Sequence, residues 1–384
     1  MNKKLAIVST HPIQYYAPVF KLLAQEIEIK IFYTQGDYSL NKFDLGFKQK
    51  IEWDLPLLDG YDYTFVENNA KDRGTHHFNG INNPTLITQI KDYQPQAVLV
   101  YGWAWKSHLK AIRYFKGRIP VYFRGDSTLF SKTSKWKTLF KPLFLKWVYS
   151  HVDLAFYVGK ANKAYFKKYG LNEKQLVFAP HAIDNERFSE NRAVEVSALR
   201  EKLGIGNEEV LLLFSGKFDM IKNPDILLDA FLKLDLKNVY LLFVGNGALE
   251  EKLKATSEKQ KTNNNRIYFM DFQNQTQMPS IYQACDLFCL PSRSETWGLA
   301  VNEAMACGKA ILVSDQVGCA IDLVKPQVNG DIFKSEDLED LKNKLLSFVA
   351  NKSRLVTFGE TSKTIIKDWS FERQVMILLQ TINV

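Results

Sequence analysis

The sequence has little cysteine and no long apolar run. Its four cysteines, Cys285, Cys289, Cys307 and Cys319, lie in apolar stretches, and their spacing matches no zinc-binding pattern. We therefore expect reduced thiols buried in a core, with neither disulfides nor a structural metal. No segment approaches the ~18 consecutive apolar residues that span a bilayer.

The amino terminus shows no sign of an export signal. Only four apolar residues, 5–8, separate Lys3-Lys4 from the polar Ser9-Thr10, and a signal peptide needs an apolar core of about 7–15 residues. We expect the chain to stay in the cytoplasm.

Two ligand-binding motifs are missing. No Asp-x-Asp triplet occurs, so nothing supports a diphosphate site anchored by a metal through that motif, and we expect neither a catalytic metal nor a cofactor. The Gly-x-Gly-x-x-Gly motif is absent after the first strand, and Val244-Gly245-Asn-Gly247 lacks the third glycine. A nicotinamide-dependent oxidoreductase is therefore disfavoured.

Composition indicates a folded protein of more than one domain. Hydrophobic residues make up 46% of the 384 residues and charged residues 24%, which provides ample apolar surface for a core. The net charge of +8 favours anionic partners such as nucleotides or acidic lipids. The lysines are dispersed and no recognition motif appears, so nucleic acid is not an expected partner.

Short apolar runs alternate with helical patterns along both halves of the chain. The runs lie at residues 5–10, 27–34, 97–102, 121–124, 154–159 and 176–180, and after the strandless segment 184–206 at residues 210–216, 239–245, 267–272, 287–291 and 310–314. This rhythm predicts two α/β domains with doubly wound parallel sheets. We expect Rossmann-like domains at 1–188 and 189–368 that face each other across a cleft, with a last helix at 369–384 packing back on the first domain.

The segment 290–308 carries two carboxylates around a predicted helix start. A buried strand ends near Pro291, and a helix begins near Leu299, so free backbone N–H groups near 296–299 favour phosphate. Glu295 and Glu303 suit vicinal hydroxyls of a sugar and a ribose. The alternative is that Glu303 is a solvated helix residue and Glu295 a capping charge.

A second signal follows the strand that ends near Phe214. Lys217 and Lys222 lie in a turn directly after it, where flexible cations suit a diphosphate. An ordinary surface turn is the alternative.

These two segments, together with Val177-Phe-Ala-Pro180-His-Ala-Ile-Asp184 and Arg187-Phe188, resemble the retaining nucleotide-sugar glycosyltransferases of GT-B fold, family 4. The resemblance implies that Glu295 contacts the donor sugar and Glu303 the ribose. It also implies that Lys217 and Lys222 hold the diphosphate, although the first position is usually Arg. The remaining residues that it assigns to the donor site are Gly216, Thr296, Trp297, Gly298, Leu299 and, near the base, Phe272.

The amino-terminal half departs from the family pattern. Ser9-Thr-His11-Pro-Ile-Gln14 has no glycine, which suggests that His11 and Gln14 contact donor or acceptor by side chain; a structural turn is the alternative for His11. Relatives tend to place a histidine after the strand 121–123, where this chain has Arg124-Gly-Asp126. Arg124 or Asp126 is therefore expected to orient the reacting sugar, and Asp126 is counted among the catalytic candidates.

The resemblance implies a metal-independent transfer of a hexose with retention of configuration. The donor is a nucleotide-diphosphate sugar, most commonly of UDP, and the acceptor is a glycan or lipid-linked sugar in cell-surface polysaccharide assembly. A nucleotide-sugar epimerase or a phosphorylase of the same fold is the alternative.

The segment 131–149 is basic and aromatic. It has five lysines and five aromatic residues without one acid, which is typical of a stretch that lies on anionic lipid at the inner face of the cell membrane. The alternative is a helix whose apolar face packs on the amino-terminal sheet.

Overall fold

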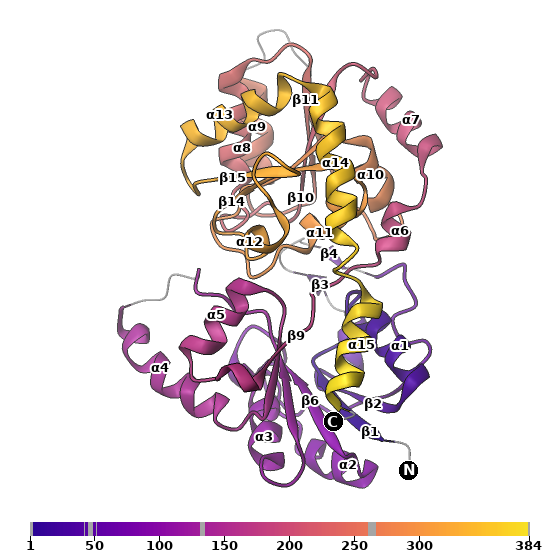
Figure 1. The fold of residues 1–384 in the computed structure, drawn as a ribbon, viewed down its shortest axis with the longest axis vertical. Helices are drawn as coiled ribbons and strands as arrows, with labels where there is room; N and C mark the ends of the chain where they lie inside the picture. Colours follow the sequence, from indigo (N-terminus) through magenta and orange to yellow (C-terminus); the bar gives the residue numbers. More distant parts are fainter. Residues whose placement is uncertain are drawn as a thin grey trace. The chain divides into compact units, whose positions relative to one another are not determined.

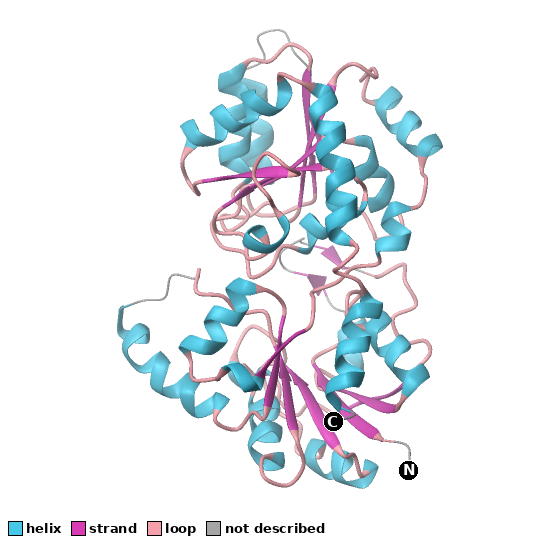
Figure 2. Cartoon of the chain, viewed as in Figure 1, coloured by secondary structure: helices cyan, strands magenta, loops and turns pink. Residues whose placement is uncertain are grey.

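The computed structural model describes residues 3–41, 43–44, 49–50, 52–130, 135–259 and 266–382 (Figures 1 and 2). They form two compact units. The first contains the described residues up to 41, those of 52–181 and those of 371–382, and the second contains 182–370 together with the short antiparallel pair β3 (Phe43–Asp44) and β4 (Gln49–Lys50).

The first unit is built on a seven-stranded parallel sheet. The strand order is β5-β2-β1-β6-β7-β8-β9. The strands are β1 (Lys4–Ser9), β2 (Glu28–Tyr33), β5 (Asp62–Phe65), β6 (Ala97–Tyr101), β7 (Val121–Arg124), β8 (Leu154–Tyr157) and β9 (Leu176–Phe178).

Helices flank this sheet in Figures 1 and 2. They are α1 (Ala17–Glu26), α2 (Leu86–Tyr93), α3 (Lys106–Phe115), α4 (Lys135–Tyr149), α5 (Lys160–Lys168) and α15 (Phe371–Ile382), with short turns η1 (Asp37–Asn41), η2 (Phe78–Gly80) and η3 (Glu173–Gln175). The last helix, α15, returns to the first unit and packs against α1. Lys3 Nζ donates to the carbonyl of Ile382 over 3.0 Å, so the two ends of the chain meet.

The second unit repeats the plan with a six-stranded parallel sheet of order β12-β11-β10-β13-β14-β15. Its strands are β10 (Val210–Ser215), β11 (Val239–Val244), β12 (Ile267–Met270), β13 (Leu287–Leu290), β14 (Ala310–Ser314) and β15 (Gly330–Phe333). Its helices are α6 (Asn185–Ser189), α7 (Ala193–Lys202), α8 (Pro224–Leu234), α9 (Glu250–Lys259), α10 (Met278–Ala284), α11 (Leu299–Ala306), α12 (Ala320–Leu323), α13 (Leu338–Val349) and α14 (Lys352–Ile366).

Both sheets are buried on two faces. In β10 the run Leu211-Leu212-Leu213-Phe214 has no exposed surface, as is typical of a parallel strand covered by helices on each side. Three helices of the second unit begin at a polar cap: Asp184, Asp337 and Asn351 each accept a backbone N–H from the first turn of α6, α13 and α14, respectively.

The predicted fold class of two doubly wound α/β sheets is confirmed. Four strands were missed from the sequence, the edge strands β5 and β15 and the short pair β3 and β4, and the segment 184–206 that reads as strandless contains α6 and α7. All four cysteines are free and buried as predicted, and burial raises the pKa of Cys285 to about 12. Among the helices of the described residues, none has the length and apolar character that crossing a bilayer requires.

Candidate functional site

The second unit has a topological switch point between β10 and β13. These neighbouring strands lie at the centre of a 3-2-1-4-5-6 strand order, in which the connections diverge to opposite faces and open a crevice at the carboxyl ends. The loops 216–223 and 291–298 leave the sheet there. They are joined by backbone bonds, since Arg293 N–H donates to the Ile221 carbonyl over 2.7 Å.

Lys222 and Glu295 form an ion pair across this switch point, between Nζ and Oε2. Asp219 Oδ1 accepts the backbone N–H groups of Ile221 (2.9 Å) and Lys222 (2.7 Å), which fixes the turn that presents Lys222. Glu295 is fixed by its backbone, which pairs with Gln316. The sequence assigned the two side chains to different parts of one ligand, and the structure brings them into direct contact.

Gly216 and Lys217 begin the loop that holds Lys222. Gly216 N–H donates to the Val244 carbonyl over 3.0 Å, and its φ of 153° lies in the region that favours glycine. A Cβ at position 245 would come within 2.1 Å of the Gly216 carbonyl oxygen. The glycines at 245 and 247 therefore serve close packing of this loop rather than a dinucleotide motif.

The start of α11 is the predicted anion-binding element. Gly298 adopts φ 99°, and no side chain caps the helix. The backbone N–H groups of the first turn therefore donate to no capping side chain, and such N–H groups at a helix start attract phosphate. Thr296 is exposed and Leu299 is half-buried.

Trp297 lies in the core rather than on the surface of the loop. It is 2% exposed, and its indole N–H donates to Asn302 Oδ1 over 2.9 Å. Its contacts make it a residue that positions the loop 295–298. Sequence reasoning missed Asn302, because only the structure shows that its buried side chain accepts the Trp297 hydrogen bond.

Glu303 is buried. Only 4% of it is exposed, and the Tyr282 hydroxyl on α10 donates to Oε2 over 2.9 Å. The alternative of a solvated helix residue is therefore wrong. A buried carboxylate held by a hydroxyl is suited to accept hydrogen bonds.

The loop after β12 is organised by Asn246, which sequence reasoning also missed. Asn246 Oδ1 accepts the Phe272 backbone N–H over 2.7 Å, and Nδ2 donates to Asp271 over 3.1 Å. This holds Phe272, the residue assigned to base contact, at the carboxyl end of the sheet.

The first unit has its own switch point between β1 and β6. His11 and Gln14 lie half-buried in the turn between β1 and α1, and His11 Nδ1 is 2.9 Å from the Thr10 hydroxyl.

His108, which the sequence analysis did not single out, joins the ends of two strands, β6 and β2, beside this switch point. Its Nδ1 lies 3.0 Å from the carbonyl oxygens of Tyr101 and Gly102, and its Nε2 lies 2.8 Å from Thr34 Oγ1. The carbonyl oxygens can only accept, so Nδ1 carries the proton and the Thr34 hydroxyl donates to Nε2. Burial lowers the pKa of His108 to about 4.

Arg124 is the last residue of β7, and Asp126 lies in the loop that follows it. Arg124 is 2% exposed, and its guanidinium donates to the carbonyls of Ala179 (3.0 Å) and Pro180 (2.9 Å), so its contacts are structural ones. Asp126 is half-buried and its charge acts on Tyr16, which stacks on His181 with ring centroids 6.0 Å apart. Burial lowers the pKa of His181 to about 3.

The basic segment 131–149 lies partly outside the described residues, which exclude 131–134 and the side chains of 135–139. In the rest of α4, Leu145, Val148 and Tyr149 are buried in the core, as the packing alternative expects. The other apolar side chains face solvent. They are Phe140 (66% exposed), Leu143 (71%), Phe144 (43%) and Trp147 (40%).

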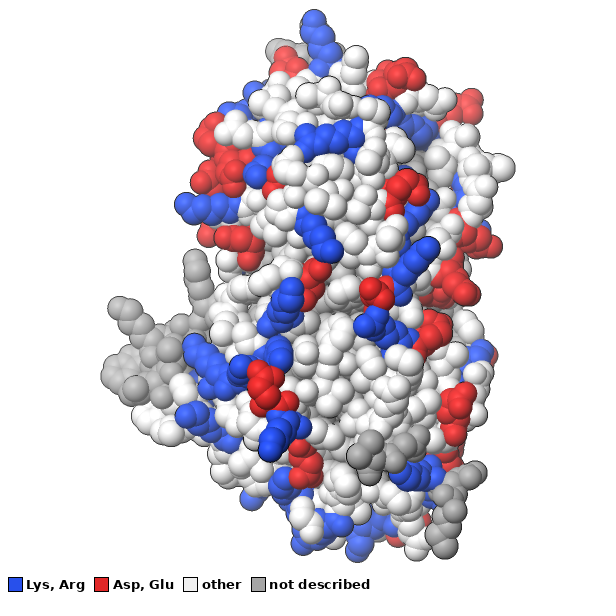
Figure 3. All heavy atoms as spheres, viewed as in Figure 1, with Lys and Arg blue, Asp and Glu red and all other residues white. Residues whose placement is uncertain are grey.

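Charge is mixed over the surface that Figure 3 draws. Lys and Arg alternate there with Asp and Glu, without one continuous basic stripe.

A family comparison covers most of the second unit. Residues 195–365 match the family model of glycosyl transferases group 1. A D-inositol 3-phosphate glycosyltransferase of Segniliparus rotundus is 30% identical over 210 residues, 53% of this chain and 46% of that protein. An alpha-galactosylglucosyldiacylglycerol synthase of Streptococcus pneumoniae is 23% identical over 254 residues, 62% of this chain and 65% of the synthase. The chain thus spans about half to two thirds of these relatives.

The whole chain is similar to solved structures. The HepE protein of Anabaena, in complex with UDP and glucose, superposes with a TM-score of 0.72 at 16% identity and 99% coverage of both chains. This likeness confirms the predicted GT-B fold.

We expect His108 to make the stability of the first unit depend on pH. Its folded pKa of about 4 lies below the ordinary ~6.5, so the unfolded chain binds an extra proton between these values and stability falls as pH drops from about 6.5 to 4. His108 contributes about 3 kcal/mol at most to the free energy of unfolding in this way. Urea unfolding of His108→Asn should show a shallower loss of stability over this range, with buried His181 supplying the remainder. The half-buried His151, outside the switch point, serves as the control: His151→Asn should match wild type, and equal slopes for all three proteins would contradict the assignment.

Proposed function

We propose that the chain is a glycosyltransferase that takes a hexose from a nucleotide-diphosphate sugar, since residues 195–365 match the family model of glycosyl transferases group 1. The observation that carries the proposal is the Lys222–Glu295 pair at the β10/β13 switch point, beside the uncapped start of α11. A cation for a phosphate, a carboxylate for sugar hydroxyls and a set of backbone amides meet there, as a sugar diphosphate requires.

We assign each group a part of the donor. Lys217, Lys222 and the amides of Gly298 and Leu299 bind the diphosphate, and Gly216 lets the backbone approach it. Glu295 accepts hydrogen bonds from the sugar and Glu303 from the ribose. The Phe272 loop contacts the base, which we propose is uracil. The HepE complex with UDP and glucose supports this choice for a protein of the same fold.

The proposed reaction retains configuration and uses no metal. The bond between the anomeric carbon and the diphosphate oxygen breaks, the acceptor oxygen bonds to that carbon on the same face, and the departing phosphate takes the acceptor proton. The chain's contribution is electrostatic, because the two lysines and the amides stabilise the negative charge that develops on the diphosphate. In the first unit, we assign Asp126, His11 and Gln14 to the reacting sugar or acceptor, with Arg124 positioning the backbone at 179–180.

For the acceptor, we propose a glycan or a lipid-linked sugar used in cell-surface polysaccharide assembly. The relative from Streptococcus pneumoniae is named as a synthase of a glycosylated diacylglycerol, and α4 exposes apolar side chains beside Lys146. We therefore place the enzyme in the cytoplasm at the inner face of the membrane, with α4 against anionic lipid.

Removing either partner of the ion pair should slow turnover. Lys222→Ala removes a charge that stabilises the leaving diphosphate, and Glu295→Ala removes the acceptor of sugar hydroxyls, so each should lower kcat by about 10²-fold or more. The measurement is release of UDP from UDP-glucose with a bacterial glycolipid extract as acceptor. Lys252→Ala, which removes an exposed ion pair with Asp225, is the control. Wild-type rates in both site variants would refute the donor site, and a product lacking a glycosylated acceptor would point to an epimerase.

Donor binding can be measured as a shift in Tm even though the acceptor is not identified. A ligand that binds only the folded state at 100 times its Kd stabilises it by about 2.7 kcal/mol. We expect UDP-glucose to raise Tm more than GDP-glucose or ADP-glucose, and Lys222→Ala to lose the shift. A larger shift with GDP- or ADP-glucose would correct the base, whereas no shift with any of them would contradict the proposal.

The exposed face of α4 should bind anionic membranes. Phe140→Ser with Leu143→Ser removes the two most exposed apolar side chains of the helix, and co-sedimentation with phosphatidylglycerol vesicles at low salt should fall by more than about half. Val194→Ser, at an 81% exposed position on α7 in the second unit, should sediment like wild type. Absence of wild-type binding, or equal binding by the double variant, would remove the membrane assignment.

A further inference from the structure

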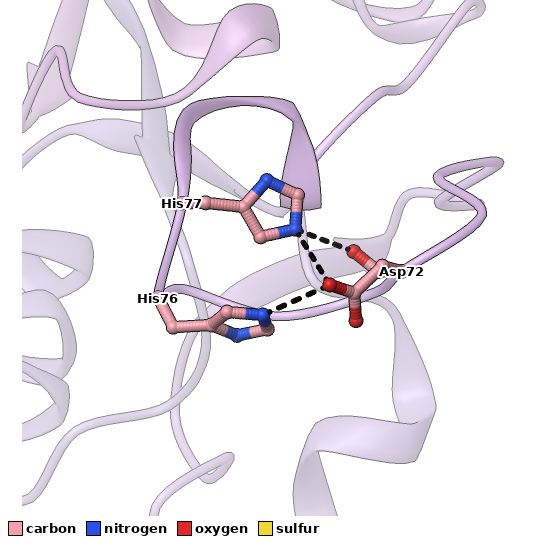
Figure 4. Close-up of side chains that lie close together, drawn as sticks. All are labelled: Asp72, His76 and His77. Atoms are coloured by element: carbon pink, nitrogen blue, oxygen red, sulfur yellow. Dashed lines mark hydrogen bonds and ion pairs between the residues drawn. The ribbon is translucent and has the colours of Figure 1, made fainter.

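The loop after β5 brings two imidazoles to one carboxylate. His76 Nε2 and His77 Nε2 each lie 3.1 Å from Asp72 Oδ2, and His77 Nε2 is also 3.1 Å from the Asp72 carbonyl oxygen. Figure 4 shows both rings directed toward Asp72. Within the described part of the chain, this is the group of three His, Cys, Asp or Glu residues whose ligand atoms converge, all lying within 4.8 Å of one another.

The backbone holds this loop in place without the three side chains. Gly74 N–H donates to the Gly80 carbonyl over 3.1 Å, and Gly80 N–H donates to the His77 carbonyl over the same distance. Asn68 Nδ2 also donates to the Gly80 carbonyl, over 2.9 Å. A Cβ at position 74 would approach His76 Nδ1 to 2.5 Å, so glycine there is what admits the imidazole.

We propose that Asp72, His76 and His77 form a binding site for Zn²⁺ or a similar transition metal. Tetrahedral Zn²⁺ with bonds of about 2.0–2.2 Å to nitrogen and oxygen places its ligands about 3.3–3.5 Å apart. The two nitrogen–oxygen separations of 3.1 Å need only a small expansion, and all three ligand atoms lie within 4.8 Å of one another, so a shift of the rings brings the two nitrogens to a shared ion. Two imidazoles and a carboxylate favour zinc over Mg²⁺ or Ca²⁺, which prefer oxygen ligands.

The exposure of the cluster indicates that water completes the coordination. The side chains of Asp72 and His76 are 72% and 61% exposed, and that of His77 is 35% exposed. Three protein ligands with an open fourth position are thus geometrically available. Because the backbone already fixes the loop, metal binding orders only these three side chains, at a small entropic cost.

The metal would stabilise a specific edge of the first unit. Trp105, just before α3, donates its indole N–H to the Thr75 carbonyl over 3.3 Å, and its ring lies 5.0 Å from that of His108 at the β1/β6 switch point. The site is thereby joined to the carboxyl end of the sheet. It lies outside the proposed donor site of the second unit, so either proposal can fail alone.

The direct test is a metal titration of the full chain after treatment with chelator and dialysis. Competition of Zn²⁺ with a chromophoric chelator should give one ion per chain. His76→Ala with His77→Ala should weaken binding by more than about 100-fold, since loss of even an outer-shell partner costs 10–100-fold. Asp72→Asn, which keeps the shape of the side chain, should weaken it by more than about 10-fold. His151→Ala, a half-buried histidine outside the cluster, should bind as wild type.

Hydrogen exchange locates the effect. Zn²⁺ should slow exchange of the amides at 74–80 in wild type and in His151→Ala but not in the His76/His77 double variant, and Mg²⁺ at the same concentration should not. Far-UV circular dichroism confirms that each variant is folded. Absence of Zn²⁺ binding at micromolar concentration, or equal affinity in the wild type and the double variant, would overturn the proposal and leave a hydrogen-bonded turn without a metal.

Discussion

The ion pair between Lys222 and Glu295 depends on one constraint, the order of the strands. In a 3-2-1-4-5-6 parallel sheet, only the two central strands send their connections to opposite faces, and in the second unit these are β10 and β13. Lys222 and Glu295 are distant in sequence, and they meet because each lies in the loop that follows one of these strands. The chemistry proposed for the donor site follows from this placement.

The partial burial of the pair suits a site whose charges change partners. Their side chains are 25% and 16% exposed, so neither charge is fully hydrated, and each compensates the other. In the proposed reaction the diphosphate replaces Glu295 as the ionic partner of Lys222. Glu295 can then accept hydrogen bonds from the sugar. Exchanging one ionic partner for another costs less than desolvating a free lysine and a free glutamate on binding.

The apolar runs in the sequence predicted the central strands of both sheets but not the edge strands β5 and β15. The continuous apolar runs of the central strands, such as 210–215, identified buried parallel strands because no other element combines that length with that composition. The edge strands β5 and β15 were missed. Asp62-Tyr-Thr-Phe65 is half-exposed and polar at one end, and Gly330-Asp-Ile-Phe333 contains a glycine and a buried acid, so neither has a pattern typical of a strand.

The site residues divide in the same way. Lys217, Lys222, Glu295 and the start of α11 could be predicted because their chemistry is visible beside a strand end. The structural contacts of Asn246, Asn302 and His108 could not be predicted, because each depends on a partner brought close only by the fold, as Phe272 is to Asn246. Trp297 was singled out from the sequence as a donor-site residue, but its burial and its bond to Asn302 follow from packing.

The two units use their switch points differently, and the difference follows from their polar residues. In the second unit the charged side chains remain partly accessible, so charge is available to a ligand. In the first unit His108 and Arg124 are buried and form hydrogen bonds with the Thr34 hydroxyl and with backbone carbonyls. Their role is to hold the strand ends in place, and the half-buried His11, Gln14 and Asp126 are the residues proposed to contact a ligand. In the proposed reaction the second unit therefore supplies the charges that bind the diphosphate, whereas the buried polar groups of the first unit hold its strand ends in place.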